Sequence, residues 1–201
     1  MSTEGVDASR RRFLTLTTSV VGGAGIVAWA LPFLASLKPS AKAQAAGAPV
    51  KIENIDKIEL GQQVVYTWRQ KPIFVVHRTP EMLESLKKVE GDLVDPQSSM
   101  DQQPDYAKNE TRSIKPEYLV LIGTCTHLGC LPKFRPDHPA PEITQNWQGG
   151  YFCPCHGSKF DLAGRVMTGS PAPKNLAVPP YRFVDDKTLI IGEDSEQKGA
   201  A

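Results

Sequence analysis

The first feature along the chain is a long apolar segment close to its amino terminus. No side chain from residue 13 to residue 37 is charged. A helix of that length, rising about 1.5 Å per residue, spans a hydrocarbon core about 30 Å thick with some tilt. The pattern therefore predicts one membrane-spanning helix. A cleaved signal peptide is the alternative, because Ala41-Lys42-Ala43 resembles a small-residue cleavage site, although an apolar signal core covers only about 7 to 15 residues.

A run of small residues, 38–49, follows this segment and offers no large apolar side chain that could dock. We interpret it as a tether: either an inert linker or a hinge whose length lets the following domain move between two partners. Beyond it, apolar residues gather in short runs rich in Val, Ile, Tyr and Phe, which predicts a mainly all-β domain. The predicted strands are 64–68, 73–77, 118–122, 150–152, 176–183 and 189–191.

One helix is expected among the strands, from Pro80 to about Glu90. Thr79 is a suitable N-cap, proline is favoured at the first helical position, and Gly91 is expected to stop the helix. Its apolar side is formed by Met82, Leu83, Leu86 and Val89. This side predicts a packing role.

Three connections between the predicted elements carry further information. Residues 185–187, between the last two apolar runs, predict a closing hairpin. The stretches 92–115 and 133–148 hold several Pro, Asp, Asn or Gln residues and few apolar ones. Such composition is typical of exposed loops, so we expect both stretches to be surface insertions.

The balance of charge narrows the class of partner. The 201 residues include 23 basic and 22 acidic side chains, for a net charge of +1. The Lys and Arg residues are scattered, whereas a phosphate-binding surface leaves a clustered basic excess. We therefore expect no nucleic-acid partner. The length suits one core plus an appendage.

The amino terminus predicts the cellular compartment. Ser9-Arg10-Arg11-Arg12-Phe13-Leu14 places an arginine pair directly before the apolar segment, which matches the twin-arginine export pattern. By the positive-inside rule these arginines stay in the cytoplasm, and everything after Lys38 then lies in the periplasm. Because that compartment is oxidising, two cysteines that are not metal ligands can persist there as a disulfide.

Two short loops hold all four cysteines and two of the four histidines: Cys125-Thr126-His127-Leu128-Gly129-Cys130 and Cys153-Pro154-Cys155-His156-Gly157-Ser158. Structural zinc is one interpretation, but zinc sites usually pair like ligands, whereas each loop here supplies one Cys and one His and carries a further cysteine. Two disulfides with idle histidines are a second, which leaves the histidine in each loop unexplained. The third is a 2Fe-2S centre in which two cysteines bind one iron and two histidines the other.

The third interpretation suits the C-x-H and C-x-x-H spacings. It assigns Cys125 and Cys153 to the first iron, and His127 and His156 to the second. Neutral imidazoles in place of thiolates make such a cluster less negative and raise its reduction potential, to about −150 to +300 mV against about −400 mV for an all-cysteine plant ferredoxin. That range suits quinol oxidation.

The two loops resemble those of the Rieske iron-sulfur subunits of quinol-oxidising cytochrome bc complexes, the ubiquinol-cytochrome c reductases. The twin-arginine start, apolar segment and tether are similar to those of proteobacterial members, so the resemblance covers nearly the whole chain. It implies an all-β, Rieske-type antiparallel β-sandwich head with a small cluster-binding β subdomain at roughly residues 119–180, plus one N-terminal transmembrane helix. The implied domains are a signal and anchor (1–37), a flexible hinge (38–49) and a periplasmic 2Fe-2S domain (50–201).

The resemblance also assigns roles to residues around the ligands. It implies a disulfide between Cys130 and Cys155, which Rieske oxygenases and their ferredoxins generally lack. It implies that the Ser158 hydroxyl bonds a bridging sulfide and raises the potential; a loop serine that satisfies its own backbone is the alternative. Two positions later, high-potential relatives carry a tyrosine whose hydroxyl bonds a ligand sulfur, and this chain has Phe160. We therefore expect a lower potential than in those relatives.

Three residues are expected at a docking surface beside the cluster. Gly169-Ser170-Pro171-Ala172-Pro173 resembles the family's proline-rich loop, which covers the cluster from a third side, although proline and glycine also mark simple turns. Pro171, Leu128 and Gly129 are the predicted partner contacts, although a leucine is elsewhere more often a core residue. His77 and His138 have no partner at ligand spacing, so both are expected to be bystanders.

For function, the resemblance implies electron transfer coupled to proton transfer. The implied catalytic residues are His156 and His127, with His156 taking the proton of a bound ubiquinol hydroxyl. The head then moves on its tether and reduces a c-type cytochrome, which contributes to proton translocation. The implied partners are a cytochrome b subunit, a c-type cytochrome and ubiquinol, in a dimeric complex of the inner membrane. The alternative is the Rieske subunit of another exported oxidoreductase, such as an arsenite-oxidase-like enzyme.

Overall fold

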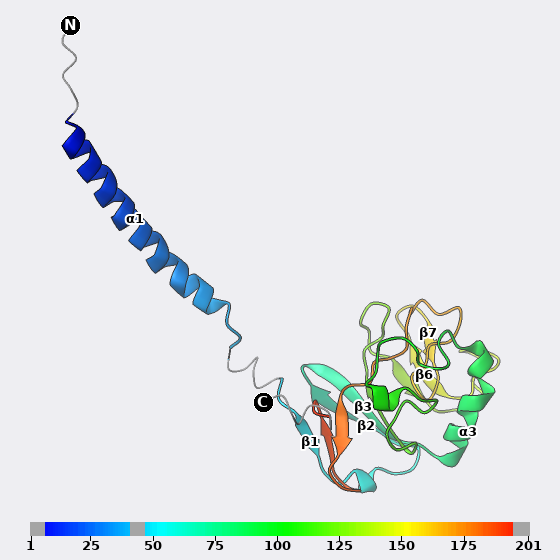
Figure 1. Ribbon diagram of the computed structural model, residues 1–201. Helices are drawn as coiled ribbons and strands as arrows, with labels where there is room; N and C mark the ends of the chain where they lie inside the picture. Colours follow the sequence, from blue (N-terminus) through cyan, green and yellow to red (C-terminus); the bar gives the residue numbers. More distant parts are fainter. Residues whose placement is uncertain (1–6, 41–46, 195–201) are drawn as a thin grey trace. The chain divides into compact units, whose positions relative to one another are not determined.

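The computed structural model describes residues 7–40 and 47–194. The chain divides into two units, Met1–Ala45 and Ala46–Ala201, the first helical and the second mainly β (Figure 1). The first unit contains α1, Ala8–Ser36, which is long and apolar enough to cross a membrane. The helix begins before the uncharged segment because the Asp7 side chain caps it, accepting hydrogen bonds from the backbone N–H groups of Ser9 and Arg10. The predicted membrane-spanning length is therefore confirmed, with the arginines inside the first turns.

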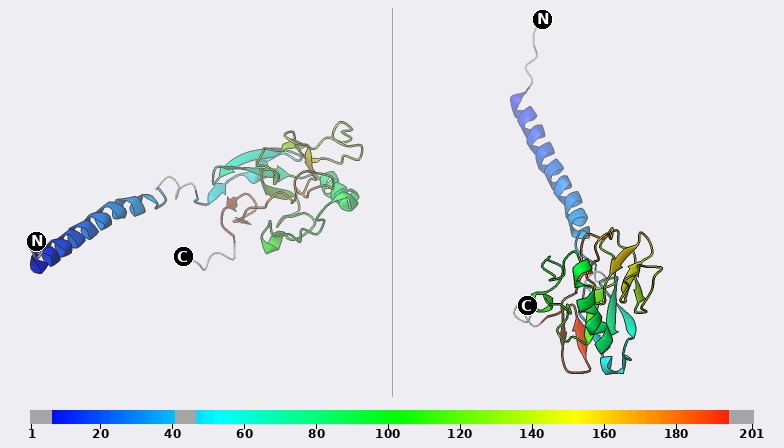
Figure 2. Two further views of the ribbon diagram at one scale, coloured as in Figure 1. Left: turned by 90° about the horizontal axis from the view of Figure 1, so that it is seen from above. Right: turned by 90° about the vertical axis from the view of Figure 1, so that its right-hand side faces the viewer.

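The described strands of the second unit form three antiparallel sheets of three strands, ordered β1-β9-β8, β2-β3-β4 and β5-β6-β7 (Figures 1 and 2). The strands are β1 Val50–Ile52, β2 Gln63–Trp68, β3 Lys71–His77, β4 Tyr118–Ile122, β5 Lys133–Arg135, β6 Gly150–Cys153, β7 Ser158–Phe160, β8 Tyr181–Phe183 and β9 Leu189–Ile191. The helical elements are α3 Pro80–Lys88 and the 3-10 turns η1 Ile55–Lys57, η2 Glu90–Asp92 and η3 Asp105–Ala107. The mostly β architecture is the predicted one.

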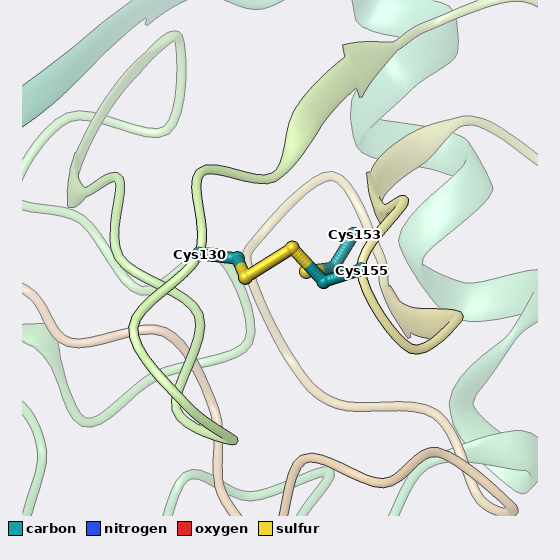
Figure 3. A group of neighbouring side chains, drawn as sticks. All are labelled: Cys130, Cys153 and Cys155. Carbon is teal, nitrogen blue, oxygen red and sulfur yellow. A yellow bond between two sulfur atoms is a disulfide. The ribbon is translucent and has the colours of Figure 1, made fainter.

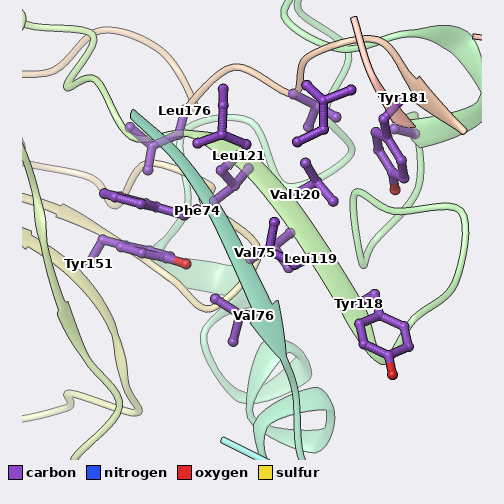
Figure 4. Packing of buried hydrophobic residues seen from close by; sticks show 14 of the residues in the cluster. Phe74, Val75, Val76, Tyr118, Leu119, Val120, Leu121, Tyr151, Leu176 and Tyr181 are labelled. Carbon is purple, nitrogen blue, oxygen red and sulfur yellow. The ribbon is translucent and has the colours of Figure 1, made fainter. Parts of the chain in front are cut away.

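The core joins the small β5-β6-β7 sheet to the larger β2-β3-β4 sheet. Phe74 of β3 and Tyr151 of β6 stack with ring centroids 5.5 Å apart and planes 3° from parallel, and Figure 4 shows the two rings lying one over the other. Both side chains are buried, as are their neighbours on β3 and β4. Gly123, directly after β4, lies so close to the Phe74 ring that a Cβ would collide with it. The stack thus fixes the small sheet against the point where the chain leaves β4.

Most predicted elements match observed ones, and the run 176–183 is the clear exception. Only Tyr181–Phe183 of that run forms a strand. The reason is the pair Pro179-Pro180, because proline has no N–H to donate to a ladder. The hairpin at 185–187 is confirmed by the antiparallel pairing of β8 with β9. The short strands β1, β5 and β7 had not been predicted.

The helix α3 is confirmed with its predicted cap. Thr79 Oγ1 accepts a hydrogen bond of 3.3 Å from the backbone N–H of Met82, and proline occupies the first turn. Leu86 and Val89 are buried on its apolar side, and Met82 and Leu83 are half-buried. The helix ends at Lys88, and a 3-10 turn, not Gly91 alone, completes its exit.

The prediction that 92–115 is a surface insertion was wrong. The Arg112 side chain is fully buried and donates hydrogen bonds to the Ala163 carbonyl, at 3.1 Å, and to Gln103 Oε1, at 2.9 Å. Burial lowers the pKa of this guanidinium to about 10, and the carbonyls that it reaches lie more than fifty residues away in sequence. Arg112 is therefore buried because its guanidinium satisfies a backbone carbonyl of another loop and a side-chain oxygen of its own segment.

The segment 133–148 is likewise not a simple surface insertion. It begins with β5 and contains Trp147, whose side chain is fully buried. Trp147 packs in a small separate core with Val89, Leu93, Ala140 and Met167. Its Nε1 donates a hydrogen bond of 3.2 Å to the Arg135 carbonyl. One large apolar residue thus anchors a mainly polar stretch.

Trp147→Ala should remove most of the contacts that hold this segment. We expect the free energy of unfolding to fall by about 3 to 5 kcal/mol, the usual cost of truncating a buried aromatic side chain. Denaturant unfolding of the detergent-solubilised full chain measures it. Gln145→Ala, at an exposed position two residues away, is the matched control and should change stability by no more than about 0.5 kcal/mol. Equal effects of the two substitutions would contradict a core role for Trp147.

Candidate metal centre

Each predicted ligand loop is built on the same short turn. In the first loop, which follows β4, the Gly129 N–H donates to the Cys125 carbonyl at 2.9 Å; in the second, between β6 and β7, the Gly157 N–H donates to the Cys153 carbonyl at 2.9 Å. Both glycines have positive φ, 81° and 77°. Because residues other than glycine are strained at such a positive φ, this turn explains why a glycine stands four residues after each predicted ligand cysteine.

The disulfide Cys130–Cys155 joins the two loops, as Figure 3 shows. Its Cα atoms are 6.6 Å apart, and it links positions 25 residues apart in sequence. The predicted pairing is confirmed. The Cys153 sulfur lies within 4.8 Å of both disulfide sulfurs, but sulfurs in a disulfide are not thiolates, so these three cysteines together are not a ligand set.

The remaining cysteines, Cys125 and Cys153, are free and buried, with exposed fractions of 3% and 1%. Burial raises the pKa of the Cys153 thiol, against backbone hydrogen bonds from Cys155 and His156 that lower it, and the neighbouring Cys125 side chain raises it again. Two buried thiols this close together need a cation beside them to become thiolates. Their surroundings suit a metal centre.

The two loop histidines also meet at this place. The rings of His127 and His156 lie edge to face, with centroids 4.8 Å apart. His127 Nδ1 is buried and has no hydrogen-bond partner among the described residues, whereas the His156 side chain is exposed. A buried ring nitrogen without a partner is costly, and a metal ion is a natural partner for it. Two buried thiols and this nitrogen fit a 2Fe-2S centre with two Cys and two His ligands.

Ser158 is the cross-strand neighbour of Cys153 in the β6–β7 register. It is fully buried, and its Oγ accepts a hydrogen bond of 3.1 Å from the Ala172 N–H. No described residue accepts the hydroxyl hydrogen, which leaves it available to a bound group. The contact is with another loop, so the alternative of a serine that satisfies its own backbone is wrong. Its hydrogen bond to a sulfide stays a prediction.

The predicted docking residues are at the surface. Leu128 is 69% exposed, and Gly129 and Pro171 are exposed too. Leu131, which had not been singled out, is 57% exposed directly after the disulfide cysteine Cys130. An apolar residue adjoining a ligand loop is the only sequence signal that could have identified Leu131.

The two other histidines, His77 and His138, interact with residues outside the two ligand loops. His77 Nδ1 bonds the Ile58 carbonyl at 2.7 Å, and its ring stacks on Tyr118 at 4.6 Å. His138 is exposed, and its Nδ1 lies 3.4 Å from the Pro136 carbonyl.

Thr126 makes a contact that the sequence analysis did not predict: its hydroxyl donates a hydrogen bond of 2.6 Å to the Lys174 carbonyl. Its position between two predicted ligands was the available signal.

Comparisons with known proteins identify the family. The family model described as "Rieske [2Fe-2S] domain" matches residues 98–181, which include both ligand loops, and "Ubiquitinol-cytochrome C reductase Fe-S subunit TAT signal" matches residues 1–40. The ubiquinol-cytochrome c reductase iron-sulfur subunit of Allochromatium vinosum is 54% identical over 194 residues, 96% of this chain and 93% of that protein. The chain belongs to this Rieske family.

Another Rieske relative, the ubiquinol-cytochrome c reductase iron-sulfur subunit of Blastochloris viridis, is 45% identical over 95% of this chain and 97% of its own length. A solved structure described as "Hyperthermophilic respiratory Complex III" aligns with 25% identity and a TM-score of 0.46, covering 87% of this chain and 98% of that one. As a Rieske subunit the chain is an electron-transfer protein with a 2Fe-2S cluster. The zinc and two-disulfide interpretations are therefore wrong.

Phe160→Tyr tests whether the absence of a tyrosine hydroxyl at this position lowers the reduction potential of the cluster. Phe160 is fully buried on β7 and pairs with Tyr151 on the face that also holds Cys153 and Ser158. A hydroxyl that reaches a ligand sulfur should stabilise the reduced cluster, so we expect the midpoint potential to rise. A redox titration followed by electron paramagnetic resonance measures it.

The control for this variant is Phe152→Tyr. Phe152 pairs with Lys159, so its side chain lies on the opposite face of the small sheet. The midpoint should not change when a hydroxyl is added there. An unchanged midpoint in Phe160→Tyr would remove the assignment of this position.

Proposed function

We propose that this chain is the subunit of a ubiquinol-cytochrome c reductase that takes electrons from ubiquinol and passes them to a c-type cytochrome. The observation that carries the proposal is the graded exposure of the centre: the two thiols are buried, whereas the His156 side chain is open to solvent. When bound, the 2Fe-2S cluster supplies a one-electron redox centre of high potential for an iron-sulfur protein. Ubiquinol and a c-type cytochrome appear in the name of the relatives' complex, and the sequences of these relatives align over nearly the full length of the chain.

The ligand assignment follows the positions of the donor atoms. Cys125 and Cys153 would hold one iron, because their sulfurs are the only free thiols in the chain. His127, whose Nδ1 is buried and unpartnered among the described residues, would hold the other together with His156 on the neighbouring loop. The Cys130–Cys155 disulfide holds the two ligand loops next to each other.

The exposed ligand handles the proton. Of the two ligand rings, that of His156 is the more exposed, so its outer nitrogen is the one a quinol hydroxyl can reach. This nitrogen accepts a hydrogen bond from the hydroxyl and then its proton. His127 is half-buried and contributes a second, less accessible ring. The cytochrome b subunit closes the quinol site, because the His156 ring is exposed on this chain and a partner is needed to cover it.

The exposed residues Leu128, Gly129 and Pro171 provide the docking surface for the cytochrome b subunit. Leu128 and Pro171 present exposed apolar side chains on two different loops, and Gly129 lies between Leu128 and the disulfide cysteine Cys130 in the sequence. Burying such a surface against a partner removes water from the exposed ligand and orients it. The alternative, a Rieske subunit of another exported oxidoreductase such as an arsenite-oxidase-like enzyme, is disfavoured by the match of residues 1–40 to the signal of the reductase family and by the reductase relatives.

The proposed placement is an uncleaved anchor in the inner membrane. Arginines 10–12 lie at the start of α1 and favour a cytoplasmic amino terminus, which places the Rieske head in the periplasm. Residues 1–37 are then signal and anchor, 38–49 the hinge, and 50–201 the head; residues 41–46 of the hinge lie outside the described part of the chain. The complex is proposed to be dimeric, as the resemblance implies.

Stiffening the hinge tests whether the head moves. Replacing Ala41, Ala43 and Ala45 together by proline should slow quinol-dependent reduction of the c-type cytochrome by on the order of tenfold or more, because an extended, semi-rigid segment restricts the reach of the head. The cluster signal in electron paramagnetic resonance should stay as in the unmodified protein. Steady-state turnover of the purified complex measures the loss.

The matched control places glycine at the same three positions, which keeps the segment flexible. That variant should retain turnover. Undiminished turnover in the proline variant, with its cluster intact, would show that electron delivery needs no movement on this segment.

A further inference from the structure

The proline-rich loop, 169–173, contacts the small sheet through the side chain of Ser170 and the backbone of Ala172. β7 is an edge strand of its sheet, and the backbone groups of Lys159 bond outside that sheet. Ser170 Oγ accepts a hydrogen bond of 3.1 Å from the Lys159 N–H and donates one of 3.3 Å to the Lys159 carbonyl. One hydroxyl therefore contacts both backbone groups of Lys159, and it is the acceptor for the Lys159 N–H.

A tight turn brings Ser170 to this edge. The Met167 N–H bonds the same Lys159 carbonyl at 3.0 Å, and the Ser170 N–H returns to the Met167 carbonyl at 3.3 Å. Gly169 has a φ of +70°, which lets the turn close without strain. The side chain of Ser170 is half-buried against β7 as a result.

Two residues beyond Ser170, the same loop contacts Ser158. The Ala172 N–H donates its hydrogen bond to Ser158 Oγ, and both residues are buried. That donor occupies one side of the serine oxygen, so the hydroxyl hydrogen must point elsewhere. No described protein group accepts it. The Ala172 N–H thus restricts the orientations open to the Ser158 hydroxyl, and Ser158 lies beside the predicted ligand Cys153 in the β6–β7 register.

We propose that Ser170 is a positioning residue that sets the reduction potential of the cluster through Ser158. Its two hydrogen bonds to Lys159 fix the loop on the edge of β7, and this fixes the donor that orients the Ser158 hydroxyl. A hydroxyl held toward a sulfide stabilises the more negative, reduced state. The inference rests on the proposed role of Ser158, and the experiment below separates the two.

The first measurement compares midpoint potentials in the full-length subunit within its complex. Ser158→Ala should lower the midpoint, and Ser170→Ala should lower it by part of that shift, because the Ser158 hydroxyl remains but is less well oriented. Ser170→Thr, which keeps the hydroxyl, should restore the original midpoint. Thr168→Ala is the matched control, since Thr168 is exposed in the same turn and its side chain makes no hydrogen bond among the described residues; it should leave the midpoint unchanged.

The second measurement asks whether Ser170 acts through Ser158. In a protein that already carries Ser158→Ala, adding Ser170→Ala should produce no further fall, since there is no hydroxyl left to orient. The iron content and the g-values of the reduced protein, measured on the same samples, show that the cluster is present in each variant.

Each other result decides the question. If Ser158→Ala leaves the midpoint unchanged, the role of Ser158 is wrong. If Ser158→Ala lowers it and Ser170→Ala does not, only the role of Ser170 is wrong. An equal fall with and without the Ser158 hydroxyl would mean that Ser170 acts on the cluster by another route, and loss of iron in Ser170→Ala alone would mean that the hydroxyl retains the cluster and does not tune it. Both results overturn the proposal.

Discussion

The covalent bond between Cys130 and Cys155 is the contact on which the centre of this protein depends. It joins two loops from different parts of the chain, each of which brings one cysteine and one histidine. Each loop is closed by backbone pairing of its own, Cys125 with Cys130 and Cys153 with Ser158, and the disulfide joins one loop to the other. The stacked rings of Phe74 and Tyr151 attach the small sheet to the main sheet. The ligands therefore sit on a frame fixed from two sides.

The arrangement separates two kinds of chemistry by depth. The free thiols are buried, where water cannot compete for a metal and where a bound cation is needed to balance their charge. The exposed histidine lies at the surface, where a proton can arrive and leave. The apolar residues around it suit a partner that covers the site for part of a catalytic cycle. In the proposed function, this small centre carries electrons at its buried thiols and a proton at its exposed histidine.

Local chemistry decided which parts could be predicted from the sequence. The cap and first turn of α3 depend on Thr79 and Pro80, which lie within it, and the ligands are recognised by their own spacing. The burial of Trp147 and Arg112 could not be predicted, because their partners come from distant segments. Composition marks a segment as polar, but only the folded chain shows which polar groups find partners inside.

The proline-rich loop shows the same limit at a finer scale. Its residues predict a turn near the cluster, and the turn is there, with Gly169 in the left-handed region. The hydrogen bonds between Ser170 and Lys159 depend on the exact register of the loop on the edge of β7, which no residue type encodes. For that reason the sequence predicts the residues proposed to hold the cluster, but it does not predict a residue proposed to orient their surroundings.

The account depends most on two histidine nitrogens binding the same centre as two cysteine sulfurs. Electron nuclear double resonance of the reduced, full-length protein measures this directly, because nitrogen bound to iron gives a strong hyperfine coupling. We expect two inequivalent coupled nitrogens, one from the buried His127 and one from the exposed His156. A spectrum with no strongly coupled nitrogen, or with a single one, would contradict the ligand set from which the rest of the account is built.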